Sequence, residues 1–320
     1  MAGFCLGSLQ KSSVYGYEIG GLTGGVFTTS TERITFSTGA YAASTISNAS
    51  EQGFAGSCGS DTVIYGYAKG RYNGSVVTAT CDRVTFATSV SAAYATGALT
   101  AARYDHFGVS DSTLYAYVAG GYNSAFSILD SVERTTFTTG VSAGIAATLS
   151  IGRIARMGGS LSDASIYGYF MGGQTVSGTF LTTVDRITFS SSTIAASTTS
   201  NLAAAKQDPA TVSDNALYGY TCGGETWSGG AVYVATTERT TFSTSATAAQ
   251  TAANLSVARG IMNGNSDGAL YGYISGGYGT GAVTTTDRIT FSTSTAAAAT
   301  ASDLTVARYA PIASFSDGAV

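Results

Sequence analysis

The chain has 320 residues, a formal net charge of −4 and only 11% charged residues, of which three are lysines. Nucleic acids and anionic membranes are bound by clusters of Lys and Arg, and the chain has no basic run, so we expect neither as a partner. Gly, Ser, Thr and Ala dominate, yet aromatic residues reach 11% and recur at regular positions, which supplies a core and argues against disorder.

The first residues, Met-Ala-Gly-Phe-Cys-Leu-Gly, lack the charged segment and the long apolar segment of a secretory signal, so we expect none. The Ala-rich runs elsewhere are interrupted by Thr, Ser and Asp, and none reaches the roughly 18 apolar residues of a membrane span. We therefore expect no insertion into a membrane.

A Tyr-x-Tyr motif recurs along the whole chain at steps of 50, 50, 52, 51 and 53 residues. A period near 50 indicates one supersecondary unit copied six times. The six copies of the motif are Tyr15/Tyr17, Tyr65/Tyr67, Tyr115/Tyr117, Tyr167/Tyr169, Tyr218/Tyr220 and Tyr271/Tyr273.

Each copy predicts four short strands in a constant order. The first follows a basic residue, as at 107–110 after Arg103, and ends in a Ser-Asp turn whose Asp can bond its own backbone. The second contains Tyr-x-Tyr, where alternation places both rings on one face and the glycine on the other. The third, such as 286–293, is rich in Thr, Ile and Phe, and the fourth is a run of Ala, Thr and Ser suited to an outer position.

Four antiparallel strands repeated six times predict an all-β, six-bladed β-propeller. We expect one domain over 1–320, with approximate repeats 1–50, 51–102, 103–152, 153–205, 206–258 and 259–307. Two further segments, 3–8 and 308–317, resemble a first strand. The second matches the other copies better, so we predict that 308–320 closes the ring beside the Tyr15 motif and displaces the N-terminus, which could then pair with another chain as a homo-oligomer.

The order of basic residue, turn, Tyr-x-Tyr, Gly-Gly and an aromatic after an acidic strand resembles the kelch repeat over the whole chain. The outer strand departs from that pattern, because it holds small residues and the single tryptophan is Trp227. Low-charge versions of this kind are similar to kelch-like propellers encoded among bacteriophage virion proteins. The resemblance implies a binding or structural protein of a virion, with a cytoplasmic interaction scaffold as the alternative.

An acid-Arg dipeptide returns in every copy, from Glu32-Arg33 to Asp287-Arg288. Because the same chemistry recurs six times, we interpret it as a structural link between strands or blades rather than as an active site. The same reasoning assigns the six Ser-Asp turns to turn capping, with a calcium ring as the weaker alternative. His106 is the sole histidine, so neither a multi-histidine metal site nor the two-histidine copper site of kelch-type oxidases can form.

The four cysteines, Cys5, Cys58, Cys81 and Cys222, fall without any Cys-x-x-Cys spacing. We expect buried thiols, with a disulfide as the alternative. No pattern predicts a catalytic residue, a metal site or a cofactor.

The copies differ most in the loop after Gly-Gly. From the second of these two positions to the acid the spacing is 11, 11, 12, 12, 14 and 10 residues. These loops emerge on one face, and Tyr, Trp and Asn among Gly and Ser are typical of recognition loops, although their rings could also pack within the fold. The predicted binding residues are Phe27, Tyr72, Asn73, Tyr122, Asn123, Gln174, Trp227 and Tyr278.

From these observations we expect a non-enzymatic structural or adhesive propeller of a phage particle. Its partner would be another virion protein or a host-surface glycan, bound by the loops of one face. The alternative is a soluble cellular scaffold or a lectin-like sugar-binding propeller.

Overall fold

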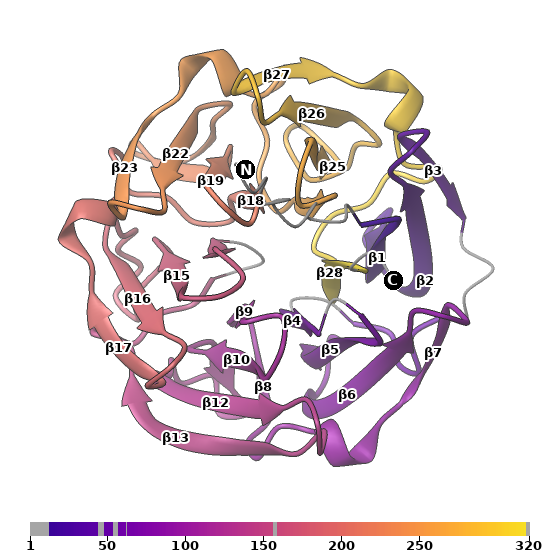
Figure 1. Cartoon of the computed structure of the whole chain (residues 1–320), viewed down its shortest axis with the longest axis vertical. Helices are drawn as coiled ribbons and strands as arrows, with labels where there is room; N and C mark the ends of the chain where they lie inside the picture. Colours follow the sequence, from indigo (N-terminus) through magenta and orange to yellow (C-terminus); the bar gives the residue numbers. More distant parts are fainter. Residues whose placement is uncertain (1–12, 44–47, 54–56, 62, 156–158, 318–320) are drawn as a thin grey trace, which may run out of the picture.

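Six four-stranded antiparallel sheets stand around a central axis in the computed structural model, which describes residues 13–43, 48–53, 57–61, 63–155 and 159–317 (Figure 1). The predicted six-bladed β-propeller is confirmed. From the axis outward, blade 1 contains β28 (Ala313–Ser316), β1 (Tyr15–Thr23), β2 (Val26–Thr35) and β3 (Ala40–Ala43); blade 2 contains β4 (Ser57–Ser60), β5 (Tyr65–Tyr72), β6 (Val77–Thr85) and β7 (Val90–Ala93); and blade 3 contains β9 (Phe107–Ser110), β10 (Tyr115–Ala119), β12 (Ser131–Thr136) and β13 (Ser142–Thr148).

The second half of the ring repeats this order. Blade 4 contains β14 (Ser160–Ser162), β15 (Tyr167–Met171), β16 (Val184–Thr188) and β17 (Thr193–Ala196); blade 5 contains β18 (Ala210–Ser213), β19 (Tyr218–Cys222), β22 (Thr237–Thr241) and β23 (Ala246–Ala249); and blade 6 contains β24 (Asn263–Ser266), β25 (Tyr271–Ser275), β26 (Thr286–Thr290) and β27 (Thr295–Ala298).

Short elements lie outside the six four-stranded sheets. The two-stranded ribbons β8 (Arg103–Tyr104) with β11 (Tyr122–Asn123), and β20 (Glu225–Trp227) with β21 (Ala231–Tyr233), lie outside the blades, and the 3-10 turns η1 (Ala95–Gly97), η2 (Thr198–Ser200), η3 (Thr251–Ala253) and η4 (Thr300–Ser302) follow outer strands. The described part of the chain contains no helix with the length and apolarity needed to cross a membrane.

The C-terminal segment closes the ring, as predicted. β28 pairs with β1 from Gly16↔Ser316 to Ile19↔Ala313, and the Asp317 carboxylate accepts bonds from the backbone N–H of Val14 and Tyr15. The competing segment 3–8 lies outside the described residues. The first and last described strands therefore share one blade, which makes the ring continuous.

The Tyr-x-Tyr motif packs neighbouring blades together. Tyr17 is fully buried and its ring stacks on Phe86 of the next blade, with 5.8 Å between ring centroids. On the opposite face of the strand there is no room for a side chain, because a Cβ atom on Gly16 would lie 2.9 Å from the Phe36 ring. The predicted alternation of rings and glycine thus sets how closely two blades approach.

The Ser-Asp turns have the predicted capping geometry. The Oδ1 atom of Asp111 accepts backbone N–H groups from Thr113, Leu114 and Tyr115 at 2.7–3.0 Å. Asp61, Asp163, Asp214 and Asp267 repeat the same three bonds, each to the second, third and fourth residue after the Asp. These bonds satisfy the turn that links the first and second strands.

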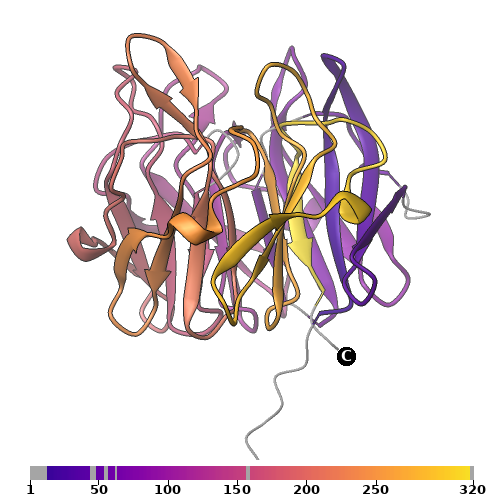
Figure 2. The same cartoon turned by 90° about the horizontal axis from the view of Figure 1, so that it is seen from above.

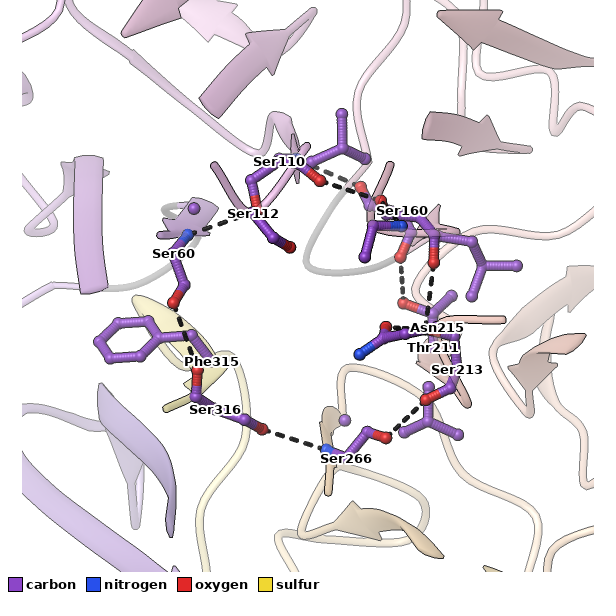
Figure 3. A pocket seen from close by; sticks show the side chains of 18 of the residues that line it. Ser60, Ser110, Ser112, Ser160, Thr211, Ser213, Asn215, Ser266, Phe315 and Ser316 are labelled. Atoms are coloured by element: carbon purple, nitrogen blue, oxygen red, sulfur yellow. Dashed lines mark hydrogen bonds between the residues drawn. The ribbon is translucent and has the colours of Figure 1, made fainter. Parts of the chain in front are cut away.

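The first strands surround a narrow central channel of about 180 Å³ (Figure 3). Its wall includes hydroxyl groups that bond from blade to blade, for example Thr211 Oγ1 to Ser160 O at 2.6 Å and Ser266 Oγ to Ser213 O at 2.6 Å. Small polar residues permit the six strands to approach closely, and their hydroxyls stabilise that approach through hydrogen bonds.

Two of the four cysteines, Cys81 and Cys222, are free thiols buried in blades 2 and 5, as expected. Burial raises the pKa of Cys81 to about 11 and that of Cys222 to about 12, so both remain protonated and unreactive near neutrality. Cys5 lies outside the described residues.

Candidate functional site

The acid-Arg dipeptides do not form ion pairs within themselves. Because neighbouring side chains of a strand point to opposite faces, the acid turns inward and the arginine turns away. Each acid binds instead the basic residue that leads into its own blade, except in blade 2. The six buried pairs are Arg308–Glu32, Arg71–Asp82, Arg103–Glu133, Arg153–Asp185, Lys206–Glu238 and Arg259–Asp287, with N–O distances of 2.6–3.1 Å and side chains no more than 4% exposed.

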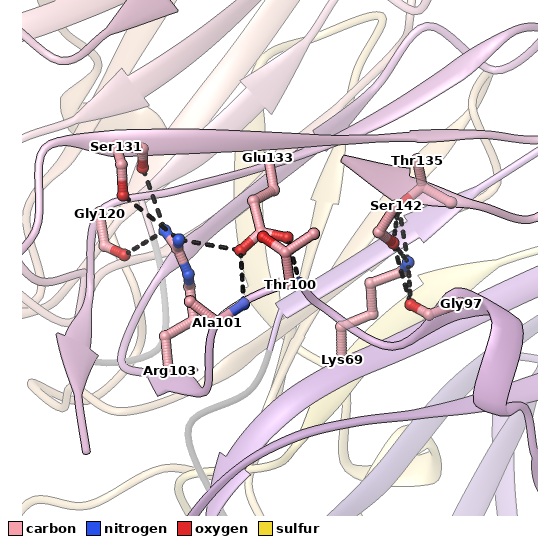
Figure 4. Close-up of polar contacts among 10 residues, drawn as sticks. All are labelled: Lys69, Gly97, Thr100, Ala101, Arg103, Gly120, Ser131, Glu133, Thr135 and Ser142. Carbon is pink, nitrogen blue, oxygen red and sulfur yellow. Dashed lines mark hydrogen bonds and ion pairs between the residues drawn. The ribbon is translucent and has the colours of Figure 1, made fainter. Parts of the chain in front are cut away.

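Blade 3 illustrates what each pair holds together (Figure 4). The Arg103 guanidinium donates to Glu133 at 3.0 Å and to the carbonyl oxygens of Gly120 and Ser131. Glu133 in turn accepts the backbone N–H groups of Thr100 and Ala101, which belong to the connection arriving from blade 2. Both charged side chains therefore bond to groups within the fold and connect one blade to the next, which agrees with the predicted structural role.

The arginines of the dipeptides lie on the other face of the strand. Arg33 stacks over the Tyr15 ring at 4.1 Å and donates to the Ser89 hydroxyl of the following blade at 3.4 Å. The same guanidinium–tyrosine contact recurs at Arg83, Arg134, Arg186, Arg239 and Arg288. This is a second repeated contact with a packing role.

Blade 2 reaches the same buried pair by an exchange of positions. Gly53 lies four residues before the first strand, where blades 3, 5 and 6 have their leading basic residue, and Arg71 replaces the second glycine of Gly-Gly. In the other five blades that glycine has φ between +91° and +104°, which favours glycine. Arg71 fills the space beside Gly53, where a Cβ atom would lie 3.1 Å from its side chain, and its Nη2 atom binds Asp82 at 2.7 Å.

Two further titratable groups are buried between blades 2 and 3. Lys69 donates from Nζ to Gly97 O, Thr135 Oγ1 and Ser142 Oγ at 2.6–2.9 Å, and burial lowers its pKa (Figure 4). His106 is 2% exposed, and burial, followed by the positive charge of Arg103, lowers its pKa to about 3. His106 is therefore neutral near pH 7 and lies in the packed interior, where solvent does not reach it.

The loops that join second and third strands all lie on one face, the upper one in Figure 2, which we call the loop face. Two of the predicted binding residues are occupied within their own turns. Asn73 Oδ1 accepts the N–H groups of Ser75 and Val76, and Asn123 Oδ1 accepts those of Ala125 and Ser127. These two asparagines therefore stabilise the turns of their own loops.

Three more predicted residues are dispersed around the loop face. Phe27 is half-buried against the next loop, where a Cβ atom on Gly74 would lie 2.6 Å from its ring. Trp227 is 66% exposed and touches Phe180 edge-on, with 6.2 Å between centroids. Tyr278 packs with Tyr233 and Tyr309 on the far side of the ring.

The remaining three, Tyr72, Tyr122 and Gln174, come together in a cleft between blades 2, 3 and 4. We call it the tyrosine cleft; its volume is about 430 Å³, and its lining residues are Tyr72, Tyr104, Asp105, Tyr122, Phe126, Ile154 and Gln174. Among the residues that the structure describes, neither a lysine nor an arginine lines it. Four aromatic rings, three of them tyrosines, with one amide and one carboxylate give the cleft both apolar and polar surface, and small-molecule sites likewise combine apolar walls with polar groups.

The rings of the cleft have a definite arrangement. Tyr104 is packed between Tyr72 and Tyr122, with centroid distances of 5.2 and 5.3 Å and interplanar angles near 30°. Phe126 meets both Tyr72 and Tyr104 at about 80°, so its ring forms a wall perpendicular to the column. Such offset-stacked and edge-to-face contacts are the favoured geometries of aromatic pairs, and they hold the wall rigid.

Sequence reasoning missed the residues that come from outside the loop after Gly-Gly. Tyr104, Asp105 and Ile154 follow the leading basic residues Arg103 and Arg153. Backbone bridges bring them beside the loop, as Tyr104↔Tyr122 and Ile154↔Gln174 show. The position after the leading basic residue also varies among the copies, and that variation was the available signal.

Two further grooves lie on the same face. One, of about 660 Å³, lies between the loops of blades 3 and 4 and includes Phe126, Ile151 and Val176. The other, of about 710 Å³, lies between blades 4 and 5 and includes Phe180 and Trp227. Val176 is 84% exposed, so these grooves present apolar surface to the solvent. In the part of the chain that is described, no three His, Cys, Asp or Glu side chains gather as a metal site would require.

No family model and no curated protein sequence matches this chain. A solved structure titled "Structure of YjhT" is similar to it with a TM-score of 0.68 and 11% sequence identity, over 90% of this chain and 97% of that one. At this identity the similarity shows the fold alone. The chain is a six-bladed β-propeller.

Proposed function

We propose that this protein is a non-enzymatic adhesive propeller of a phage particle, which binds a host-surface glycan through its loop face. The observation that carries the proposal is the tyrosine cleft, where three predicted binding residues from three blades meet in one cavity. A propeller presents loops from every blade on one face, so several loops can contact one ligand.

The contacts of the charged residues support the non-enzymatic part of this proposal. The acids that recur in all six copies are in buried ion pairs, and the turn aspartates of blades 2 to 6 accept three backbone bonds each through Oδ1. His106 is buried as a neutral imidazole. A general acid or base needs contact with a substrate proton, and these groups lie inside the packing between strands and blades.

The phage assignment and the virion location rest on the sequence resemblance and on the low charge of the chain. A mass-spectrometric inventory of purified particles tests them directly. The proposal predicts the protein among the particle components, and its absence from particles would refute a virion role.

Binding to the host surface is tested with the purified, fluorescently labelled full chain on host cells. Periodate oxidation of surface glycans should abolish the binding. Loop-face substitutions should weaken it, whereas Leu217→Ala, which removes a side chain 61% exposed in an Asp turn on the opposite face, should not. Periodate-resistant binding would point to a protein receptor.

A protein partner is the second candidate, and the two further grooves favour it. Trp227 and Val176 are strongly exposed, and Trp, with its large apolar area, is enriched at protein interfaces. Under this alternative Trp227→Ala would weaken capture of another particle protein, while Gln174→Ala, which lies in the tyrosine cleft and in neither groove, would leave it unchanged.

A further inference from the structure

We infer that the tyrosine cleft is a subsite for a neutral sugar, held by stacking on Phe126 and the tyrosine column and oriented by Gln174. This deepens the proposed function and rests on it for the biological context, although the chemistry of the cleft is argued from its own residues. Phe27, Trp227 and Tyr278 lie elsewhere on the face and have no part in it.

The aromatic wall suits the face of a pyranose ring. C–H groups on one face of a sugar carry partial positive charge and are attracted to the negative face of an aromatic ring. Phe126 is 56% exposed beside the cleft, and Tyr72 and Tyr122 are half-buried around the buried Tyr104. The cavity of about 430 Å³ lies within the range of small-molecule sites and accommodates roughly one or two sugar rings.

The polar groups of the cleft suit hydroxyls rather than charges. Gln174 donates one amide hydrogen to Gly178 O at 3.2 Å, and its Oε1 atom and second amide hydrogen make no bond within the described residues. These two groups can accept from and donate to neighbouring hydroxyls of a sugar. The described lining residues include the Asp105 carboxylate and neither a lysine nor an arginine, so they offer no cation to pair with an anionic sugar.

Backbone strain at Phe126 is a second, independent indication. Its φ is +58°, in the left-handed region where a bulky side chain is disfavoured and glycine is at ease. The turn is closed by Phe126 N to Asn123 O and by the two bonds to the Asn123 side chain, none of which requires a phenyl ring. A strained aromatic that presents its ring beside a cavity is what a binding site would retain.

The test is an array of oligosaccharides, followed by equilibrium titration of every one that binds. Neutral probes are cellohexaose, maltohexaose, xylohexaose and chitohexaose, and acidic probes are hexagalacturonate and sialyllactose. We expect the full chain to bind at least one neutral probe. Phe126→Gly and Gln174→Ala should each weaken that binding at least about tenfold, as the loss of one good stacking or hydrogen-bonding contact does.

Trp227→Ala is the control, because Trp227, like Phe126, is a loop-face ring that is more than half exposed and has an edge-on aromatic contact. It should bind the probe within about twofold of the unsubstituted chain, and thermal unfolding of all variants confirms that they are folded. Phe126→Gly is chosen because it removes the ring and relieves the backbone at once, so lost binding cannot be attributed to unfolding.

Three results would overturn the inference: no probe binds, only acidic probes bind, or the cleft variants bind as well as Trp227→Ala does. The proposed function is judged separately by the cell assay. Periodate-sensitive binding to cells that is indifferent to Phe126→Gly and Gln174→Ala would remove the cleft and leave the adhesive role standing. If the chain does not bind cells, but the cleft variants bind a neutral probe more weakly than the unsubstituted chain does, the adhesive role is refuted and the sugar subsite stands.

Discussion

The buried ring of ion pairs and the loop face behave in opposite ways. At the buried positions all six blades keep the same acid–base contact, with Lys206 replacing arginine in blade 5. On the loop face the residues differ among the blades, apart from the Tyr-Asn pair that blades 2 and 3 share, and aromatic side chains gather between blades 2 and 4. Residues that recur in every blade are therefore the ones that packing requires. Residues that vary from blade to blade lie on surface that packing does not constrain.

Blade 2 sharpens this contrast. There the basic residue has moved from the leading position to the Gly-Gly position, and Gly53 and Arg71 have exchanged roles. The contact to Asp82 survives although both sequence positions differ from those of the other blades. What the fold requires is a cation beside the buried acid, supplied from either side.

The largest expected effect comes from breaking one buried pair. Arg153→Met leaves Asp185 buried without its cation, so we expect about 3–5 kcal/mol less stability in urea unfolding. Arg288→Met is the control, because Arg288 is exposed and stacks on Tyr271 at 4.4 Å; it should cost about 1 kcal/mol or less. Equal losses in the two variants would contradict the distinction between the buried pairs and the exposed arginines.

The exchange in blade 2 can be reversed. Arg71→Gly alone should destabilise the protein by about 3 kcal/mol because Asp82 loses its partner. Adding Gly53→Arg should restore most of the lost stability, measured as the urea midpoint of unfolding. The new side chain has room, because the side chain that crowds Gly53 is that of Arg71 itself. If the double variant is no more stable than Arg71→Gly, the two positions are not equivalent sources of the cation.

His106 stands between the two classes, since it is buried but occurs once. Its folded pKa of about 3 lies below the usual value of 6.5, so the unfolded chain binds the proton first and stability falls as the pH falls through 6.5. At pH 5 this contribution amounts to about 2 kcal/mol. His106→Leu should flatten the fall in melting temperature between pH 7.5 and pH 5, and an unchanged slope would show that His106 does not titrate as described.

The channel wall should respond more weakly. Thr211→Val removes the hydroxyl that donates to Ser160 O at 2.6 Å while keeping the shape of the side chain. One hydrogen bond of this kind stabilises a fold by about 1 kcal/mol, and we expect that loss in denaturant unfolding. Ser191→Ala, at an exposed hairpin, serves as the reference and should change nothing measurable.

The smallest change in stability is expected on the loop face. Phe126→Gly relieves a left-handed φ but increases the entropy of the unfolded chain, and the two effects largely cancel. We expect its unfolding free energy, and that of Trp227→Ala, to lie within about 0.5 kcal/mol of the unsubstituted protein. A loss as large as that of Thr211→Val would mean that the Phe126 ring supports the fold and is not held mainly for binding.

Much of the fold could be predicted because its signals are local. Tyr17 and Phe86 recur at a fixed period, and the Asp111 turn follows from side chain to backbone bonds spanning four residues. The candidate site was predicted in part: Tyr72, Tyr122 and Gln174 meet in the cleft, whereas Asn73 and Asn123 serve their own turns and Trp227 lies apart. Tyr104 was missed because it reaches the cleft from a different connection.

By itself the sequence determined the number of blades, the order of their strands, the capped turns and the closing role of β28, because strand alternation and turn chemistry act over a few residues. Only the tertiary structure decided which cation meets which acid, as Arg308 and Glu32 do across 276 residues of chain. It also decided that three tyrosines from two blades form one wall. Such contacts depend on how closely whole blades pack, and no short stretch of sequence carries that information.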